Sequence, residues 1–434
     1  MLAELVGVTI VQGEFLSFAA RIAPLFTASN PSAYHSQLAK KSTESSDLNS
    51  SRLPMPSSPA FLTHSKRLRK SILAALAKQG FRTKGKVVEY PRNLTKDSVR
   101  EMHTIAVAHR RENAKAYLQR HESRLLGYIA NGEELDPSQV QPKLVLVKPD
   151  TEQELLFRYV SLHWSIPVSS GYGRRLRFLV FDHQNGKLIG LLGLGDPVYS
   201  LRARDEMIGW DADTKRRNLY HVMDAFVLGA VPPYSRLLCG KLIAMLALSN
   251  EVRRCFRTKY KGSVTLIRGQ RHSTGLVLLT TTSALGRSSI YNRLRLDGTD
   301  YWSSIGFTQG SGEFHFSNGV YGDIREFVEV YCNPTAKTAA WGDGFRNKRE
   351  VIKKCLSSLG LPPDLLYHGI QRQIFLAPLA RNGIAFLKGE EQRIRFYDRP
   401  ATILSDAFLA RWLQPRAART QDYKDFDRES YRLW

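Results

Sequence analysis

The pattern of apolar and polar positions between residues 171 and 316 predicts a run of strands with two helices among them. Two apolar segments, Leu176–Phe181 and Lys187–Leu194, flank a turn that contains Asn185 and Gly186, a pair that accepts the positive φ of a hairpin. Further along the chain the pattern predicts a strand, a helix, a strand, a short helix and a last strand, over Asp224–Leu228, Leu237–Leu248, Ser263–Ile267, Ser289–Arg293 and Ser304–Thr308. We therefore expect an α+β fold, in which one mixed sheet carries the longer helix on its surface.

The flanking segments differ from this core in composition and period. Residues 1–60 are predicted to be poorly ordered: 1–27 is one amphipathic helix or sequence outside the fold, and 28–60 is a linker rich in Ser, Pro, Asn and Thr. Residues 61–150 form a basic helical domain with a strand over Lys143–Val147, and 151–316 form the sheet core. Residues 317–414 form an extension packed on that core, and 415–434 form a polar tail that is expected to fray.

Two helices have recognisable ends. Thr151, followed by Glu154, has the spacing of a capping box and predicts a helix through Leu162. A second helix is predicted from Arg346 to Leu359, because Gly360 follows it as a stop signal.

Charge is the strongest compositional signal. The chain carries 63 Lys and Arg against 40 Asp and Glu, a net charge of +23, and residues 61–140 alone carry 16 against 8. This excess favours a polyanionic partner, with DNA ahead of RNA, bound through phosphates with little sequence preference. The candidate contacts are two arginines after a Gly/Ser loop and four cations of one predicted helix: Arg174, Arg175, Arg346, Lys348, Arg349 and Lys353. The alternative is a basic protein whose charged helix faces are only solvated.

Cysteine usage and hydropathy indicate a cytoplasmic protein. The four cysteines are far apart in the sequence and lack zinc-ligand spacing, which suits reduced thiols and predicts no metal site. No apolar run approaches the roughly 18 residues of a membrane span, so no membrane partner is expected.

The order of predicted elements resembles the acetyltransferase-like fold of the GNAT superfamily. In that fold the loop after the fourth strand offers backbone N–H groups to the pyrophosphate of acetyl-CoA. The resemblance implies that this role falls on Arg236, Leu238, Cys239, Gly240 and Lys241, although the loop is one residue longer here and has Lys241 where a small residue is usual.

The same resemblance suggests catalytic roles for two residues. Tyr291 would act as general acid to the leaving thiolate, and Asp224 would take a proton from an amine if its pKa were raised. The alternatives are a core tyrosine with a satisfied hydroxyl and a carboxylate that anchors a neighbouring arginine.

The sequence gives less support to ATP hydrolysis, metal binding and nuclease activity. The sequence has no phosphate-binding loop of the ATPase type and no histidine pair with metal-ligand spacing. A metal-dependent nuclease would need clustered carboxylates, and five acidic residues lie close together in the sequence: Asp196, Asp205, Glu206, Asp211 and Asp213. Because arginines are interleaved with them, ion pairing is the favoured role.

Several long motifs resemble the uncharacterised family that includes the A protein of the Druantia anti-phage system. They read GYGRRLRFLV, KLIGLLGLGDPVYSL, ARDEMIGW, MDAFVLGAVPPYSRLLCGKL, IGFTQGSGEFHF and WGDGFRNKREVIKKCL, within a resemblance from about Ser65 to Leu387. The resemblance implies a role in defence against phage, with other defence subunits as candidate partners, but no established reaction. Three functions remain open: a nucleic-acid-binding recognition subunit, an acetyl-CoA-dependent N-acetyltransferase and a nuclease.

Overall fold

The computed structural model describes residues 58–84, 87–89, 95–168, 173–264, 275–296, 298–317, 319–335 and 344–434. All of them belong to one compact unit, Leu53–Trp434. The predictions for residues 1–57, for most of the Gly/Ser loop and for the strand beyond residue 264 lie outside the described residues.

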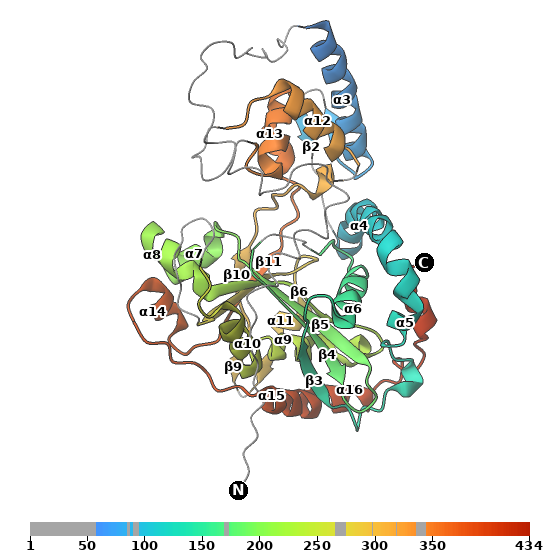
Figure 1. Cartoon of the computed structure of the whole chain (residues 1–434), viewed down its shortest axis with the longest axis vertical. Helices are drawn as coiled ribbons and strands as arrows, with labels where there is room; N and C mark the ends of the chain where they lie inside the picture. The colour runs from blue at the N-terminus through green and yellow to red at the C-terminus, as the bar shows by residue number, and fades with distance from the viewer. Residues whose placement is uncertain are drawn as a thin grey trace, which may run out of the picture. The chain divides into compact units, whose positions relative to one another are not determined.

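A seven-stranded mixed sheet is the centre of the fold (Figure 1). Its strands follow the order β10-β11-β7-β6-β5-β4-β3, in which β6 and β7 are parallel and every other neighbouring pair is antiparallel. In chain order they are β3 (Pro142–Leu146), β4 (Arg175–Asp182), β5 (Leu188–Gly195), β6 (Val222–Ala230), β7 (Leu278–Thr282), β10 (Ser303–Phe307) and β11 (Gln373–Pro378). The predicted α+β class and mixed sheet are confirmed.

The predicted hairpin forms β4 and β5. Gly186 has a φ of 71° in the turn between them, a conformation that glycine adopts without a Cβ clash. Along β4, Leu176, Phe178 and Val180 face one hydrophobic cluster, whereas Leu179 faces another. This alternation, with a period of two, buries both faces of the sheet.

Helices cover each face. On one face α9 (Cys239–Leu246) packs against β5 and β6, and α10 (Asn250–Tyr260) and α15 (Ala401–Phe408) join the same cluster. On the other face α6 (Glu152–Ser161) packs against β4, and α5 (Glu122–Leu126) packs against α6. The predicted helix over 237–248 is therefore α9, and it lies on the sheet as expected.

A separate hydrophobic cluster joins helices that are far apart in the sequence. It is built from α3 (Pro59–Ala77), α12 (Tyr321–Tyr331) and α13 (Lys348–Ser358) (Figure 1). Ile72, Phe327 and Ile352 are fully buried in it. The sequence divides the chain at residues 150 and 316, but this cluster crosses both positions, and β3 and β11 extend the sheet beyond them.

The remaining elements are mostly short. They are β1 (Arg82–Lys84), β2 (Val87–Glu89), α4 (Lys96–Leu118), η2 (Gln119–His121), η3 (Gly132–Glu134), α7 (Arg202–Ile208), α8 (Ala212–Asn218), η4 (Leu219–His221), η5 (Tyr234–Leu237), α11 (Ser289–Asn292), β8 (Arg295–Leu296), β9 (Thr299–Asp300), η6 (Phe314–Phe316), η8 (Pro363–Leu366), α14 (Gly383–Lys388), the π-helix η9 (Leu409–Leu413), α16 (Gln414–Ala417) and η10 (Arg428–Tyr431). Among the described residues, no helix combines the length and the apolar character that crossing a bilayer requires.

Two local predictions are wrong. The hydroxyl of Thr151 donates to the carbonyl of Lys148 at 2.7 Å, and Glu154 accepts from the N–H of Asp150, so the predicted capping box does not form. Residues 415–434 are not frayed: Tyr423, Phe426 and Tyr431 are buried. These aromatic side chains, spaced along an otherwise polar segment, supply the packing that composition alone did not reveal.

Candidate functional site

The parallel strands β6 and β7 separate part of the way along their length. Their ladder pairs Val222 with Leu278, Met223 with Leu279 and Asp224 with Thr280. Beyond that last pair, β7 continues to pair with β11, and β6 pairs, among the described strands, only with β5. The register of β5 against β6 shifts between Gly193 and Leu194, where a bulge bends a strand and increases its twist.

A cavity of about 400 Å³ lies where the two strands part. One wall is residues 225–228 of β6, and the other is residues 281–285 at the end of β7. Residues 289–291 of α11 line it as well. Its exposed cations come from α4 and from the β7–α11 connection, and its remaining lining comes from the segment after α6: Lys96, Arg100 and Arg287, then Trp164, Ser165 and Ile166.

Two further cavities continue this one along α4. A cavity of about 360 Å³ shares Lys96, Leu285 and Arg287 with it, and another of about 480 Å³ shares Arg100, Trp164 and Ser165. We call the three together the α4 groove. A concave surface of this size, lined by polar and apolar groups in similar proportion, is a candidate ligand site.

Helix α4 presents cations to the α4 groove because of how it begins. Thr95 caps the helix by accepting from the N–H of Ser98, which fixes the first turn. Lys96 and Arg100 are then one turn apart and share a face. The guanidinium of Arg100 forms an ion pair with Asp97. Both side chains are largely exposed, so this pair contributes little to stability, and a phosphate could take the place of the Asp97 carboxylate.

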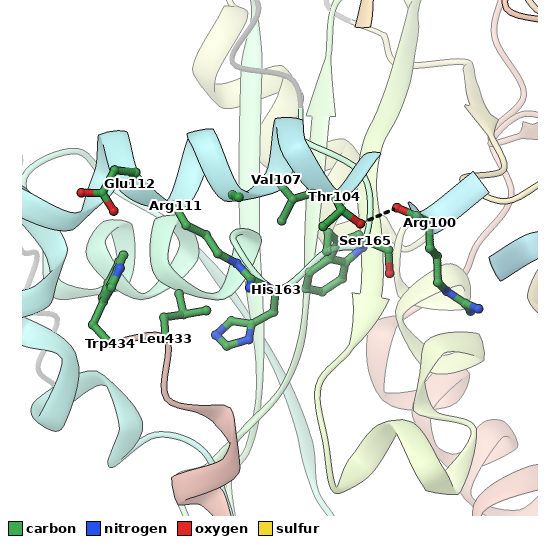
Figure 2. A pocket seen from close by; sticks show the side chains of 11 residues that line it. Arg100, Thr104, Val107, Arg111, Glu112, His163, Ser165, Leu433 and Trp434 are labelled. Atoms are coloured by element: carbon green, nitrogen blue, oxygen red, sulfur yellow. Dashed lines mark hydrogen bonds between the residues drawn. The ribbon is translucent and has the colours of Figure 1, made fainter. Parts of the chain in front are cut away.

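The far end of the groove has aromatic walls. Figure 2 shows Thr104, Val107 and Arg111 of α4 facing His163, Ser165 and Leu433. The ring of His163 stacks on Tyr431 with centroids 3.5 Å apart, and burial, with Arg111 nearby, lowers the pKa of His163 to about 3. His163 is therefore neutral near pH 7, and the positive charge here belongs to Arg111.

Asp224 lies on β6 at the point of separation. Its carboxylate accepts a hydrogen bond of 2.8 Å from the hydroxyl of Thr280 on β7. Burial raises the pKa of Asp224 to about 6, although Thr280, Arg204 and Arg175 oppose the rise. A raised pKa is the condition given above for Asp224 to take a proton from an amine, and Asp224 has such a pKa.

Tyr291, on α11, lines the cavity between β6 and β7, whereas Asp224 directly precedes the β6 wall of that cavity. Its ring lies 4.8 Å from that of Phe375 and 5.2 Å from that of Trp302, between centroids, and the residue is buried. Burial raises the pKa of its hydroxyl, which interacts with Thr281 and with the charge of Asp224. The structure thus brings Tyr291 and Asp224 to one place, and the tyrosine is also a core residue.

The residues proposed to hold acetyl-CoA are engaged within the protein. Lys241 is buried, its Nζ donates to the carbonyls of Arg293 at 2.8 Å and Ile290 at 3.3 Å, and burial lowers its pKa to about 8. A Cβ on Gly240 would lie 3.0 Å from the side chain of Ile290. Arg236 donates to the carbonyl of Asp422, Cys239 is fully buried, and Leu238 is partly exposed with a φ of 62°. α9 therefore begins against other parts of the chain.

Arg174, just before β4, and Arg175, its first residue, are packed against other parts of the protein. Arg174 bonds to Asp196 at 2.6 Å and to the carbonyl of Tyr220, and its guanidinium lies 4.0 Å from the centre of the Tyr220 ring. Arg175 lies over Phe226 at 4.2 Å, and its Nε is buried with no hydrogen-bond partner among the residues that the structure describes. Burial lowers the pKa of Arg175.

The four predicted cations near α13 divide into two kinds. Lys348 donates to Ser317 at 2.6 Å and Arg349 donates to Ser311 at 2.5 Å, so both fasten the helix to the preceding segment. Arg346 and Lys353 are exposed. Their role in binding nucleic acid stays a prediction.

The five clustered carboxylates are used in pairing and capping, as favoured from the sequence. Asp205 bonds to Arg204 and Lys215 at 2.7 Å each, and Asp211 caps α8. Asp196, Glu206 and Asp213 pair with Arg174, Arg202 and Arg216. In the part of the chain that the structure describes, no group of three His, Cys, Asp or Glu is placed to hold a metal ion.

Sequence reasoning missed Lys96, Arg100, Trp164 and Arg287. The spacing of Lys96 and Arg100 signals a shared helix face, but nothing local indicates that this face borders the opening between β6 and β7. Trp164 carries no sequence signal either, because it is set by long-range packing against Gly229, where a Cβ would lie 2.9 Å from the indole.

Fold and groove define a basic α+β protein with a mixed seven-stranded sheet. The model of a family described as "Druantia protein DruA" matches residues 93–389. The curated Druantia protein DruA of Escherichia coli (strain UMEA 4076-1) is 39% identical over 362 residues, which cover 82% of this chain and 89% of that protein. No solved structure matches. The chain belongs to the Druantia DruA family, which confirms the resemblance found in the sequence and its implication of anti-phage defence.

Proposed function

We propose that this chain is a nucleic-acid-binding recognition subunit of anti-phage defence in the cytoplasm, built on a GNAT-like scaffold. The observation that carries the proposal is the α4 groove, in which exposed cations and a tryptophan line one continuous concave surface. The groove residues Lys96, Arg100, Trp164 and Arg287 all lie within the segment that matches the family. Other subunits of the defence system are proposed partners of the bound complex.

The scaffold proposal rests on topology. Counted from β3, the fourth strand is β6, and the helix that follows it is α9, as in the acetyltransferase-like fold described above. β7, the parallel neighbour of β6, separates from it part of the way along, and the short helix α11 comes before β10. The order of strands supports common architecture, and a scaffold of this kind can serve functions other than acyl transfer.

Nucleic acid is proposed as the ligand because of charge. The chain has a net charge of +23. A positive groove attracts a phosphate backbone at long range and releases counterions when it binds. Arg100 and Arg287 can each make charge-assisted hydrogen bonds to phosphate oxygens, whereas Trp164 offers a flat apolar face to a base.

Acetyl-CoA-dependent N-acetyltransfer is the second candidate. The separation of β6 and β7 favours it, as does the pKa of about 6 for Asp224 beside Tyr291. The start of α9 does not favour it, because the backbone N–H groups of Leu238 and Lys241 already donate to carbonyls of Ser235 and Leu238, where a pyrophosphate would need open backbone donors. A nuclease ranks lower, since the clustered carboxylates are already paired.

Direct binding tests the main proposal. Labelled DNA and RNA oligonucleotides are titrated with the full chain at about 50 mM salt, and fluorescence anisotropy is measured. The groove variant Arg100→Gln/Arg287→Gln should weaken binding at least about tenfold, because each lost charge-assisted contact contributes on the order of 1 kcal/mol. The matched variant Arg346→Gln/Lys353→Gln removes the same charge from the candidate contacts near α13, outside the groove, and should weaken binding less than the groove variant does. Undetectable binding by wild type contradicts the proposed function. If Arg346→Gln/Lys353→Gln loses more affinity than the groove variant, the main phosphate contacts lie near α13 and not in the groove.

Calorimetry with acetyl-CoA tests the second candidate. Heat of binding that disappears in Gly240→Pro would support acyl transfer, because proline removes a backbone donor at the start of α9. Absence of heat with wild type would reject it.

A further inference from the structure

We infer that the α4 groove binds a single strand of nucleic acid and stacks a base on Trp164. This inference rests on the proposed function and names the form of nucleic acid that the groove selects. Three features of the groove carry it: its continuity, the spread of its cations and the position of the indole.

The groove is continuous. Its three cavities, of about 360, 400 and 480 Å³, share residues at each junction. Each is large enough for a drug-sized ligand, and together they follow α4 from Lys96 to Glu112. A duplex keeps its bases stacked inside and presents only its phosphates at a recess of this kind, whereas a single strand can enter it.

The cations are distributed along the groove. Lys96 and Arg100 are separated by about 6 Å along the helix axis, and Arg111 lies about 16 Å further on, at 1.5 Å per residue. Arg287 reaches the same surface from the β7–α11 connection. Such a row suits a chain of phosphates better than one isolated phosphate.

Trp164 stands between the two larger cavities and lines both. It is half-buried, and Gly229 of β6 gives it the room it occupies: a Cβ there would come within 2.9 Å of the indole. The indole is therefore held by the sheet with part of its surface in the groove. An aromatic platform beside a row of cations is the arrangement that binds single strands with little sequence preference.

The inference is tested by comparing a single-stranded oligonucleotide with the duplex of the same sequence. Wild type should bind the single strand more tightly at about 50 mM salt. Trp164→Ala should weaken single-strand binding roughly 5- to 100-fold, the range for loss of one base–aromatic stack, and should leave duplex binding unchanged. Trp164→Phe should restore most of the affinity, because a phenyl ring still stacks.

The control is Tyr117→Ala. Tyr117 is an exposed aromatic residue on the same helix and lines none of the three cavities. This variant should bind both oligonucleotides as wild type does, and thermal unfolding of each variant checks that it is folded.

The outcomes separate the inference from the proposed function. Equal binding of single strand and duplex, with Trp164→Ala like wild type, overturns the inference and leaves nucleic-acid binding intact. Failure of wild type to bind either oligonucleotide at about 50 mM salt overturns both.

Discussion

Asp224 shows how a single half-buried carboxyl can make stability depend on pH. Its pKa is about 6 in the folded chain, against 3.8 for an unperturbed aspartate. Between these two values the folded protein retains a proton that the unfolded chain releases. The free energy of unfolding therefore falls as pH rises through this window and loses nothing more from Asp224 above it.

We predict that Asp224→Asn removes this pH dependence. Asparagine cannot ionise, so the stability of the variant relative to wild type should increase between pH 4 and pH 7, by on the order of 1–3 kcal/mol. Urea denaturation at several pH values measures the difference. A difference that stays constant or falls with pH would show that the carboxylate is well solvated.

Glu122 connects residues far apart in the sequence. It is buried, and its Oε1 accepts from the hydroxyl of Tyr159 at 2.9 Å and from the N–H of Leu433 at 2.6 Å. We predict that Glu122→Ala lowers the free energy of unfolding by about 2–4 kcal/mol, because buried donors lose a charged acceptor. Glu429→Ala, which breaks an exposed pair with Arg432, should cost less than about 0.5 kcal/mol. Similar losses in chemical denaturation of the two variants would contradict this account.

At the level of residues, the sequence predicted which side chains could take part in chemistry better than it predicted where those side chains lie. Asp224 and Tyr291 were chosen from their places in predicted elements, and the structure places them near enough for the charge of Asp224 to act on the hydroxyl of Tyr291, although only Tyr291 lines the cavity. Lys348 and Arg349 were predicted as a phosphate-tracking face, but their side chains bond to serines of the preceding segment. Helical spacing shows which side chains share a face, and only tertiary contacts decide which of them remain available.

Among the elements, β5 depends on its glycines for close packing. A Cβ on Gly190 would lie 2.4 Å from the backbone oxygen of Gly229 and 2.8 Å from the Cα of Ala230, both on β6. Backbone atoms of a paired strand cannot move aside without breaking the ladder. Glycine at this position therefore sets the approach of the two strands, although it is unfavourable for strands in general.

We predict that Gly190→Ala destabilises the protein by about 1–3 kcal/mol, through overpacking against β6. Gly322 provides the comparison: it lies in α12, and no atom of the described residues would meet its Cβ within 4 Å. Gly322→Ala should stabilise by about 0.5–1 kcal/mol, because alanine loses less entropy in a helix. Chemical denaturation of both variants measures these changes in the free energy of unfolding. A Gly190→Ala variant as stable as wild type would mean that β5 and β6 can separate at little cost.

The sequence predicted elements well where the signal was local. The hairpin of β4 and β5 has a turn with a defined mechanism, and α9 follows an apolar strand at the expected place. The position of β11 in the sheet could not be predicted, because a short apolar run does not distinguish a strand from a buried helix segment. Its insertion between β7 and β10 is a long-range event.

For the whole molecule, packing joins segments that the sequence keeps apart. α3 packs with α12 and α13, although they are separated by more than two hundred residues. The buried aromatics of residues 415–434 join the clusters of the sheet. Composition records only local properties, so it predicted consecutive domains along the chain. The hydrophobic clusters instead join segments that are distant in the sequence.

The positive charge is also a property of the whole molecule, and it leads to the central claim. Of the predicted basic residues, Arg174, Lys348 and Arg349 have protein partners. The α4 groove adds Lys96, Arg100 and Arg287, which are exposed beside a continuous recess, although Arg100 also forms an exposed ion pair with Asp97. If these cations contact phosphates, binding must release counterions in proportion to their number.

The most direct test is the salt dependence of affinity for a single-stranded oligonucleotide, compared between wild type and Arg100→Gln/Arg287→Gln. For wild type, the logarithm of the binding constant should fall linearly with the logarithm of salt concentration. Its slope should be about −0.7 for each phosphate contact. The variant should bind more weakly at low salt, with a slope less steep by about 1.4. A variant with the slope and affinity of wild type would show that the α4 groove is not where the backbone binds.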